Sequence, residues 1–84
     1  MTAYAIQRTP AASTTTLAAT STFCAYAYVQ ATPANTGVIT IGDATGQYLV
    51  VSETDYLRIG PCDLNAVTVK GTVAGDKVNV LYFI

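Results

Sequence analysis

The sequence predicts an all-β fold, a single small β-sandwich or jelly-roll-like barrel of about 6–8 short antiparallel strands. Hydrophobic residues alternate with a period of two over most of the chain, and no stretch carries the stripe of an amphipathic helix. Turn residues such as Gly, Asn, Asp and Pro recur about every ten residues, a spacing typical of short strands in such folds. At 84 residues the chain has room for one domain.

The C-terminal segment 77–84 has the clearest alternation. One of its faces carries Val78, Val80, Tyr82 and Ile84. The other face becomes apolar at Leu81 and Phe83, which predicts a central strand that is covered on both sides in its C-terminal half. We expect Val67–Lys70 to be its partner in a hairpin across the loop Gly71–Asp76.

Segment 22–32 alternates as well. One face carries Phe23, Ala25, Ala27, Val29 and Ala31, and the other carries Cys24, Tyr26, Tyr28 and Gln30. Small residues opposite large ones suit close packing of one sheet on another. Shorter strands are predicted at 38–41, 47–51, 56–59 and 67–70, each bounded by residues that favour turns.

The first residues of the chain have a different composition. We divide the chain into residues 1–21, an N-terminal arm or edge strand with an Ala/Thr-rich junction, and residues 22–84, the β-sandwich domain. The junction at 10–16 is compositionally simple and buries little apolar surface. Three arrangements stay open: an edge strand of its own sheet, an arm on a neighbouring subunit, or an ordinary first strand and loop.

The charge content favours assembly with other protein subunits. Only 11% of the residues are charged, four basic and five acidic, whereas soluble domains usually carry about 25%. The alternative is a neutral, Thr-rich surface that contacts nothing. With a net charge of −1 and no basic cluster we expect no nucleic acid, and without a long apolar run we expect no membrane span. The start of the chain lacks a signal-peptide pattern, so we expect a protein made in a cytoplasm.

Residues suited to catalysis are scarce. The chain has no histidine, which removes the commonest general base and metal ligand. The carboxylates Asp43, Glu53 and Asp55 lie in predicted turns, where they are expected as turn residues rather than as a catalytic pair or a calcium site. We therefore expect no enzyme, no cofactor and no metal site.

Cys24 and Cys62 are the two cysteines. In a reducing cytoplasm we expect them to be free thiols that act as small buried hydrophobic residues, with a disulfide as the alternative.

Tyrosine is the enriched residue type that suits a contact surface. Six of the eight aromatic residues are tyrosines, whose rings give rigid contact area and whose hydroxyls tolerate water. Tyrosine also favours strands, so that some of these rings must line the core. The candidate interface residues are Tyr4, Ile6, Arg8, Tyr48 and Tyr56.

From Asn35 to Phe83 the chain resembles short virion proteins of tailed bacteriophages. The shared features are the run Asn35–Asp43, a loop, the Tyr-Leu-Val-Val segment 48–51, the Tyr-Leu-Arg-Ile segment 56–59, and the final run Asp63–Phe83 with its Gly-Asp loop. Here that loop, Gly71–Asp76, is one residue longer than the pattern of those proteins.

The resemblance implies a β-sandwich that acts as a capsid decoration (cement) protein. It further implies contacts with copies of itself (a homotrimer, or alternatively a dimer) and with the major capsid protein. The protein would then be synthesised in the host cytoplasm and located on the capsid surface of the virion. The alternatives are a neck, tail-fibre, or receptor- or carbohydrate-binding β module, and exposed aromatics in a groove would favour sugar binding.

Overall fold

The computed structural model describes residues 1–10 and 14–84, and for Tyr48 the backbone alone. The described residues form ten β-strands and no helix, so the all-β prediction is confirmed. The strands are β1 (Ala3–Arg8), β2 (Thr15–Thr16), β3 (Phe23–Cys24), β4 (Tyr26–Ala31), β5 (Ile39–Asp43), β6 (Gly46–Val51), β7 (Leu57–Ile59), β8 (Cys62–Asp63), β9 (Thr68–Gly71) and β10 (Val78–Phe83). The count exceeds the expected 6–8 because β2, β3 and β8 are two-residue pairings.

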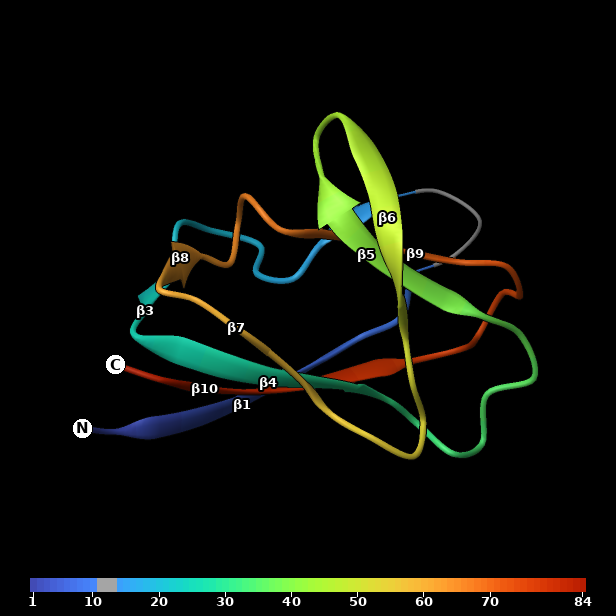
Figure 1. The fold of residues 1–84 in the computed structure, drawn as a ribbon, viewed down its shortest axis with the longest axis horizontal. Coiled ribbons are helices and arrows are strands. Elements are labelled where there is room, and N and C mark those ends of the chain that lie inside the picture. The colour runs from blue at the N-terminus through green and yellow to red at the C-terminus, as the bar shows by residue number, and fades with distance from the viewer. Residues whose placement is uncertain (11–13) are drawn as a thin grey trace.

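Two four-stranded antiparallel sheets form the layers of a sandwich (Figure 1). Sheet A has the order β1-β10-β4-β7, and sheet B has the order β2-β9-β5-β6. The small pair β3-β8 lies at the end of the sandwich where both termini are found (Figure 1). As predicted, β10 is a central strand, because β1 and β4 flank it. The expected cover on both sides of its C-terminal half is wrong, because Leu81 is 42% exposed on the outer face.

The core lies between the sheets and consists of small and medium-sized aliphatic side chains. In sheet A the inward row runs from Ile6 through Val80 and Val29 to Leu57, which are aligned across the four strands. Sheet B contributes Val69 from β9, Ile39 and Ile41 from β5, and Val51 from β6. The buried residues of the core are Leu17, Ala18, Cys24, Ala27, Val29, Ala31, Ile39, Ile41, Val51, Leu64, Val69, Val78 and Val80.

The expected hairpin between 67–70 and 77–84 is wrong. β9 pairs with β5 and β2 in sheet B, whereas β10 lies in sheet A. The connection between them crosses from one sheet to the other, and Asp76 fixes it there. The buried Asp76 carboxylate accepts hydrogen bonds from the backbone N–H of Thr36 (3.1 Å) and Gly37 (2.7 Å). The carboxylate thus ties this crossing to the β4–β5 connection, which crosses beside it.

The alternation predicted for 22–32 is interrupted at Ala25. The chain bends there, between β3 and β4, and the inward face changes from even to odd positions. Cys24 is therefore buried, and so are Ala27 and Val29, whereas Phe23 is exposed although it belongs to the same predicted face as Ala27. The bend turns the short β3 toward its partner β8.

The N-terminal segment forms part of the sandwich. β1 is the edge strand of sheet A, paired with β10 from Ala3 to Arg8. Leu17 and Ala18 are buried in the core, so residues before 22 also contribute to the packed unit. Within the Ala/Thr-rich junction, residues 11–13 lie outside the described residues.

Candidate binding surfaces

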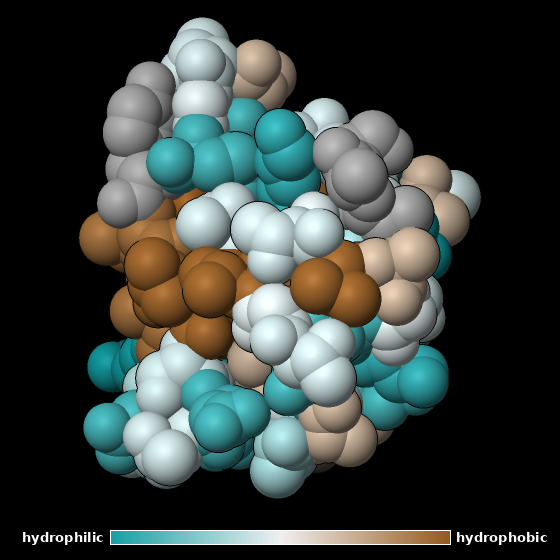
Figure 2. All heavy atoms as spheres, turned by 90° about the vertical axis from the view of Figure 1, so that its right-hand side faces the viewer, coloured by the Kyte–Doolittle hydropathy of each residue, from teal (hydrophilic) through white to brown (hydrophobic). Residues whose placement is uncertain are grey.

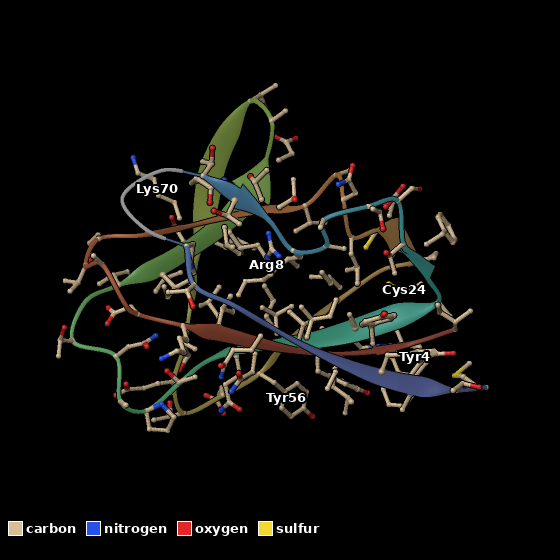
Figure 3. All side chains as sticks on the ribbon, turned by 180° about the vertical axis from the view of Figure 1, so that it is seen from behind. Tyr4, Arg8, Cys24, Tyr56 and Lys70 are labelled. Carbon is tan, nitrogen blue, oxygen red and sulfur yellow. The ribbon has the colours of Figure 1, made fainter. Side chains whose placement is uncertain are left out.

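The five candidate interface residues do not form one surface. Tyr56 is 67% exposed on the outer side of sheet A, pointing away from sheet B (Figure 3). Tyr4 is 46% exposed but belongs to the inward row of sheet A, where its ring stacks on Tyr82 at 5.3 Å between centroids. The side chain of Tyr48 lies outside the described residues.

The structure places Ile6 and Arg8 on the inward row of β1, and Ile6 also belongs to the lining of the groove described below. Both alternate with the outward residues of β1, so they point toward the space between the sheets. Ile6 packs against the core, because it is aligned with Val80 and Val29. The Arg8 side chain extends between the layers (Figure 3), and its Nε donates a hydrogen bond to the carbonyl oxygen of Thr16 at 3.1 Å.

The outer face of sheet A carries an aromatic cluster. Because antiparallel partners share a face, Phe83 stands beside Tyr26, and Leu81 stands beside Tyr28. Phe83 stacks on Tyr26 at 4.7 Å between ring centroids. Tyr56 packs edge-on against Tyr28 at 4.9 Å, and Tyr26 against Tyr28 at 5.7 Å. Such geometries suit the ring quadrupoles and hold the four rings in fixed positions.

An open groove of about 760 Å³ runs beside this cluster, across β1, β10 and β4. Its apolar floor contains Ala5 and Leu81, and Tyr28 and Tyr56 form the aromatic wall. The turn that carries Tyr56 is fixed on both sides. Ser52 Oγ accepts hydrogen bonds from the N–H groups of Thr54 and Asp55, and the Gln30 amide donates to the carbonyl oxygen of Glu53.

Three amide side chains make the other end of the groove polar. These are Gln7, Gln30 and Asn79, one from each of three neighbouring strands, aligned in a single row. Gln7 Nε2 donates to Asn79 Oδ1 at 2.8 Å, which leaves the Gln7 carbonyl oxygen and the Asn79 amino group able to bind a further partner. Among the described residues, those that line the groove are all uncharged.

A second apolar surface lies on sheet B. It consists of Val38, Leu49 and Val50, and we call it the β6 flank. Leu49 is 55% and Val50 is 68% exposed, although they point to opposite faces of β6, the edge strand of the sheet. Figure 2 views the end of the molecule that lies on the right in Figure 1. Hydrophobic side chains gather on the left of this view, which is the side that faces the viewer in Figure 1, where β6 lies.

The two cysteines face each other across β3 and β8 as free thiols, with 4.0 Å between their Sγ atoms. Burial raises the pKa of Cys62 to about 11, and the neighbouring Cys24 adds to the shift. A thiol with such a pKa stays protonated near neutral pH, which makes it a poor nucleophile and metal ligand.

The carboxylates of Asp43 and Asp63 accept hydrogen bonds from backbone N–H groups. Asp63 accepts hydrogen bonds from Ser21 Oγ and from the N–H groups of Thr22 and Asn65, and these bonds lower its pKa. Asp43 accepts from Thr45 and Gly46 in the turn before β6, and its pKa is lowered likewise. In the described parts of the chain no three potential metal-binding side chains lie together. Asp43 and Asp63 thus hold the backbone of the segments around them.

Comparison with protein-family models, with curated proteins and with solved structures finds no match for this chain. Within residues 1–10 and 14–84, no helix is long and apolar enough to cross a membrane.

Sequence reasoning missed the residues that build the groove. Tyr28, Leu81 and the three amides were not candidates for contact. A strand with small apolar residues on one face and tyrosines on the other gives no sign of which face is inward. The pairing of β1 with β10, which brings Gln7 to Asn79, left no local signal in the sequence because the two residues are 72 positions apart.

Proposed function

We propose that the protein is a structural subunit that acts through protein–protein contacts, specifically a capsid decoration (cement) protein of a tailed bacteriophage. In this proposal it binds copies of itself and the major capsid protein, on the capsid surface of the virion. The β6 flank is the observation that carries the proposal. The resemblance of residues 35–83 to virion proteins supplies the biological setting.

The β6 flank supports a subunit contact because it lacks the usual protection of an edge strand. Edge strands are commonly protected by charged residues, proline or bulges. The sequence of β6 contains no charge and no proline. A bulge at Tyr48, opposite the Ile41–Gly42 step, interrupts its N-terminal half, but Leu49 and Val50 follow the bulge and remain uncovered. A second subunit would remove these side chains from water.

Sedimentation velocity tests the self-association. We expect the purified chain to form an oligomer at about 100 μM, and Val50→Lys to shift it toward monomer by placing a charge in the contact. Lys70→Ala is the matched control, since Lys70 is exposed on the same sheet and outside the β6 flank. A wild-type chain that stays monomeric would contradict self-association through this flank.

The location on the virion needs a separate experiment. Particles purified from the source of the sequence should contain this chain in a copy number comparable to that of the major capsid protein, as measured by quantitative mass spectrometry. A few copies per particle would instead indicate a neck or tail component. Its absence from purified particles would contradict the virion assignment altogether.

A further inference from the structure

We propose that the groove on the outer face of sheet A is a binding site for a neutral oligosaccharide. This site is separate from the β6 flank and does not depend on the decoration function. The inference is drawn from three properties of the groove: an exposed aromatic wall, a row of amides and a lining without charge.

The aromatic wall matches the apolar face of a sugar ring. Pyranose rings present C–H groups on their faces and hydroxyl groups around their edges. Tyr56 is largely exposed, and its packing against Tyr28 fixes the orientation of its ring. Because the turn before it is held by Ser52 and Gln30, the ring is positioned before a ligand arrives, which lowers the entropic cost of binding.

The amide row matches the edge of the same ligand. A hydroxyl group both donates and accepts hydrogen bonds, and so does a carboxamide. Gln7 and Asn79 together still offer an acceptor and a donor after their mutual hydrogen bond, and these lie in the groove beside the aromatic wall. A saccharide, which is apolar on its ring faces and hydroxylated at its edges, can contact both parts of the groove.

The charges around the groove favour a neutral ligand. Arg58 is the register partner of Tyr28 in sheet A, and it lies over the ring of Tyr26, with Cζ 4.9 Å from the centroid. It is not part of the groove lining. An acidic saccharide would thus place its carboxylates beside uncharged amides, whereas a neutral one leaves no charge unpaired.

The size of the groove also favours a saccharide over a protein partner. A volume of about 760 Å³ lies within the range of small-molecule sites. Protein partners usually bury about 800 Å² on each side, so such a partner would have to extend beyond the nine residues that line the groove.

Titration of the ¹⁵N-labelled chain followed by NMR tests the proposal. The probes are cellopentaose, maltopentaose, chitopentaose and mannopentaose, each up to about 10 mM. We expect at least one of them to give saturable shifts confined to β1, β10, β4 and the turn at 53–56. Tyr56→Ala should weaken that binding about tenfold, and Tyr56→Phe should retain it because the ring remains.

Two further variants separate a sugar site from a protein site. Tyr4→Ala is the matched control. Tyr4 is also an exposed tyrosine of sheet A, but it belongs to the inward row and not to the outer face that carries the groove. Its loss should therefore leave the titration unchanged. Asn79→Leu should weaken saccharide binding, whereas it would strengthen an apolar protein contact. The proposal is overturned if none of the four probes gives saturable shifts, or if the groove signals shift only with protein concentration.

Discussion

The groove on sheet A and the β6 flank on sheet B are both uncovered apolar surfaces, yet they are built differently. The groove combines rings fixed against one another with amides from three strands, in the middle of its sheet. The β6 flank consists of exposed aliphatic side chains at the edge of its sheet. Fixed polar groups select a ligand by its hydrogen bonds, whereas an aliphatic edge favours any complementary apolar surface. The first surface is therefore suited to recognition and the second to assembly.

The largest effect is expected from a core substitution that unfolds the domain and so abolishes both surfaces. Val80→Asp places a carboxylate in the core between the sheets, where Val80 is almost fully buried. We expect a loss of several kcal/mol in the free energy of unfolding, comparable to the whole stability of so small a domain. Lys77→Asp, in the exposed position before β10, should cost less than about 0.5 kcal/mol. Urea denaturation of the two variants measures the difference, and equal stabilities would mean that the inward row of β10 is misassigned.

A smaller effect is expected where the two sheets are connected. Asp76→Ala leaves the N–H groups of Thr36 and Gly37 without their carboxylate acceptor, which should lower the free energy of unfolding by about 1–3 kcal/mol. Asp55→Ala is the control, since Asp55 lies exposed in a turn. If the two variants denature at the same urea concentration, Asp76 does not hold the crossing.

The distinction between the two surfaces is tested by measuring both self-association and saccharide binding for a variant of each surface. Val50→Lys should weaken self-association about tenfold and leave saccharide titration unchanged, whereas Tyr56→Ala should do the reverse. We expect Val50→Lys to change the free energy of unfolding by less than about 0.5 kcal/mol, because Val50 is exposed. Tyr56→Ala should lower it by about 0.5–1.5 kcal/mol, because the pair with Tyr28 is lost. A variant that changes both readouts while its melting temperature is unaffected would show that the two surfaces are one site.

The last expected effect is confined to alkaline pH. Because the pKa of the Cys62 thiol is about 11 in the folded chain and 9.0 without burial, the unfolded chain loses this proton first as the pH rises. The thiol should therefore leave stability unchanged below pH 9 and lower it progressively between pH 9 and about 11. Thermal melts of the wild type and of Cys62→Ala across this range isolate the effect as a difference in slope. Parallel slopes would contradict the raised pKa.

The strands were predictable from the sequence, but their assignment to sheets was not. Alternation at 78–83 is a local property, so the position of β10 and its buried face followed directly from it. The hairpin prediction failed because a Gly-rich loop at 71–76 can join two neighbouring strands or cross between sheets. The difference depends on Asp76 meeting Thr36 and Gly37, residues far away in the sequence.

The candidate site was predictable in part for the same reason. Tyr56 follows a turn and precedes a strand, and such a position is often exposed. Ile6 and Arg8 could not be assigned to a face, because the face of an edge strand is set by its partner. Once β1 pairs with β10 in the observed register, both side chains must point inward. The groove appears only after that pairing, since it needs residues from three strands.

The pairing of β1 with β10 also determines when the protein can fold. β10 is the central strand of sheet A, yet it is the last strand along the chain, and both of its neighbours are synthesised before it. Until it emerges from the ribosome, β1 and β4 have no partner between them, and the inward row of each stays exposed. Contacts between such distant segments slow folding, and unpaired strands with exposed apolar residues are prone to aggregate. We therefore expect sheet A to form in one step, when β10 pairs with β1 and β4 together.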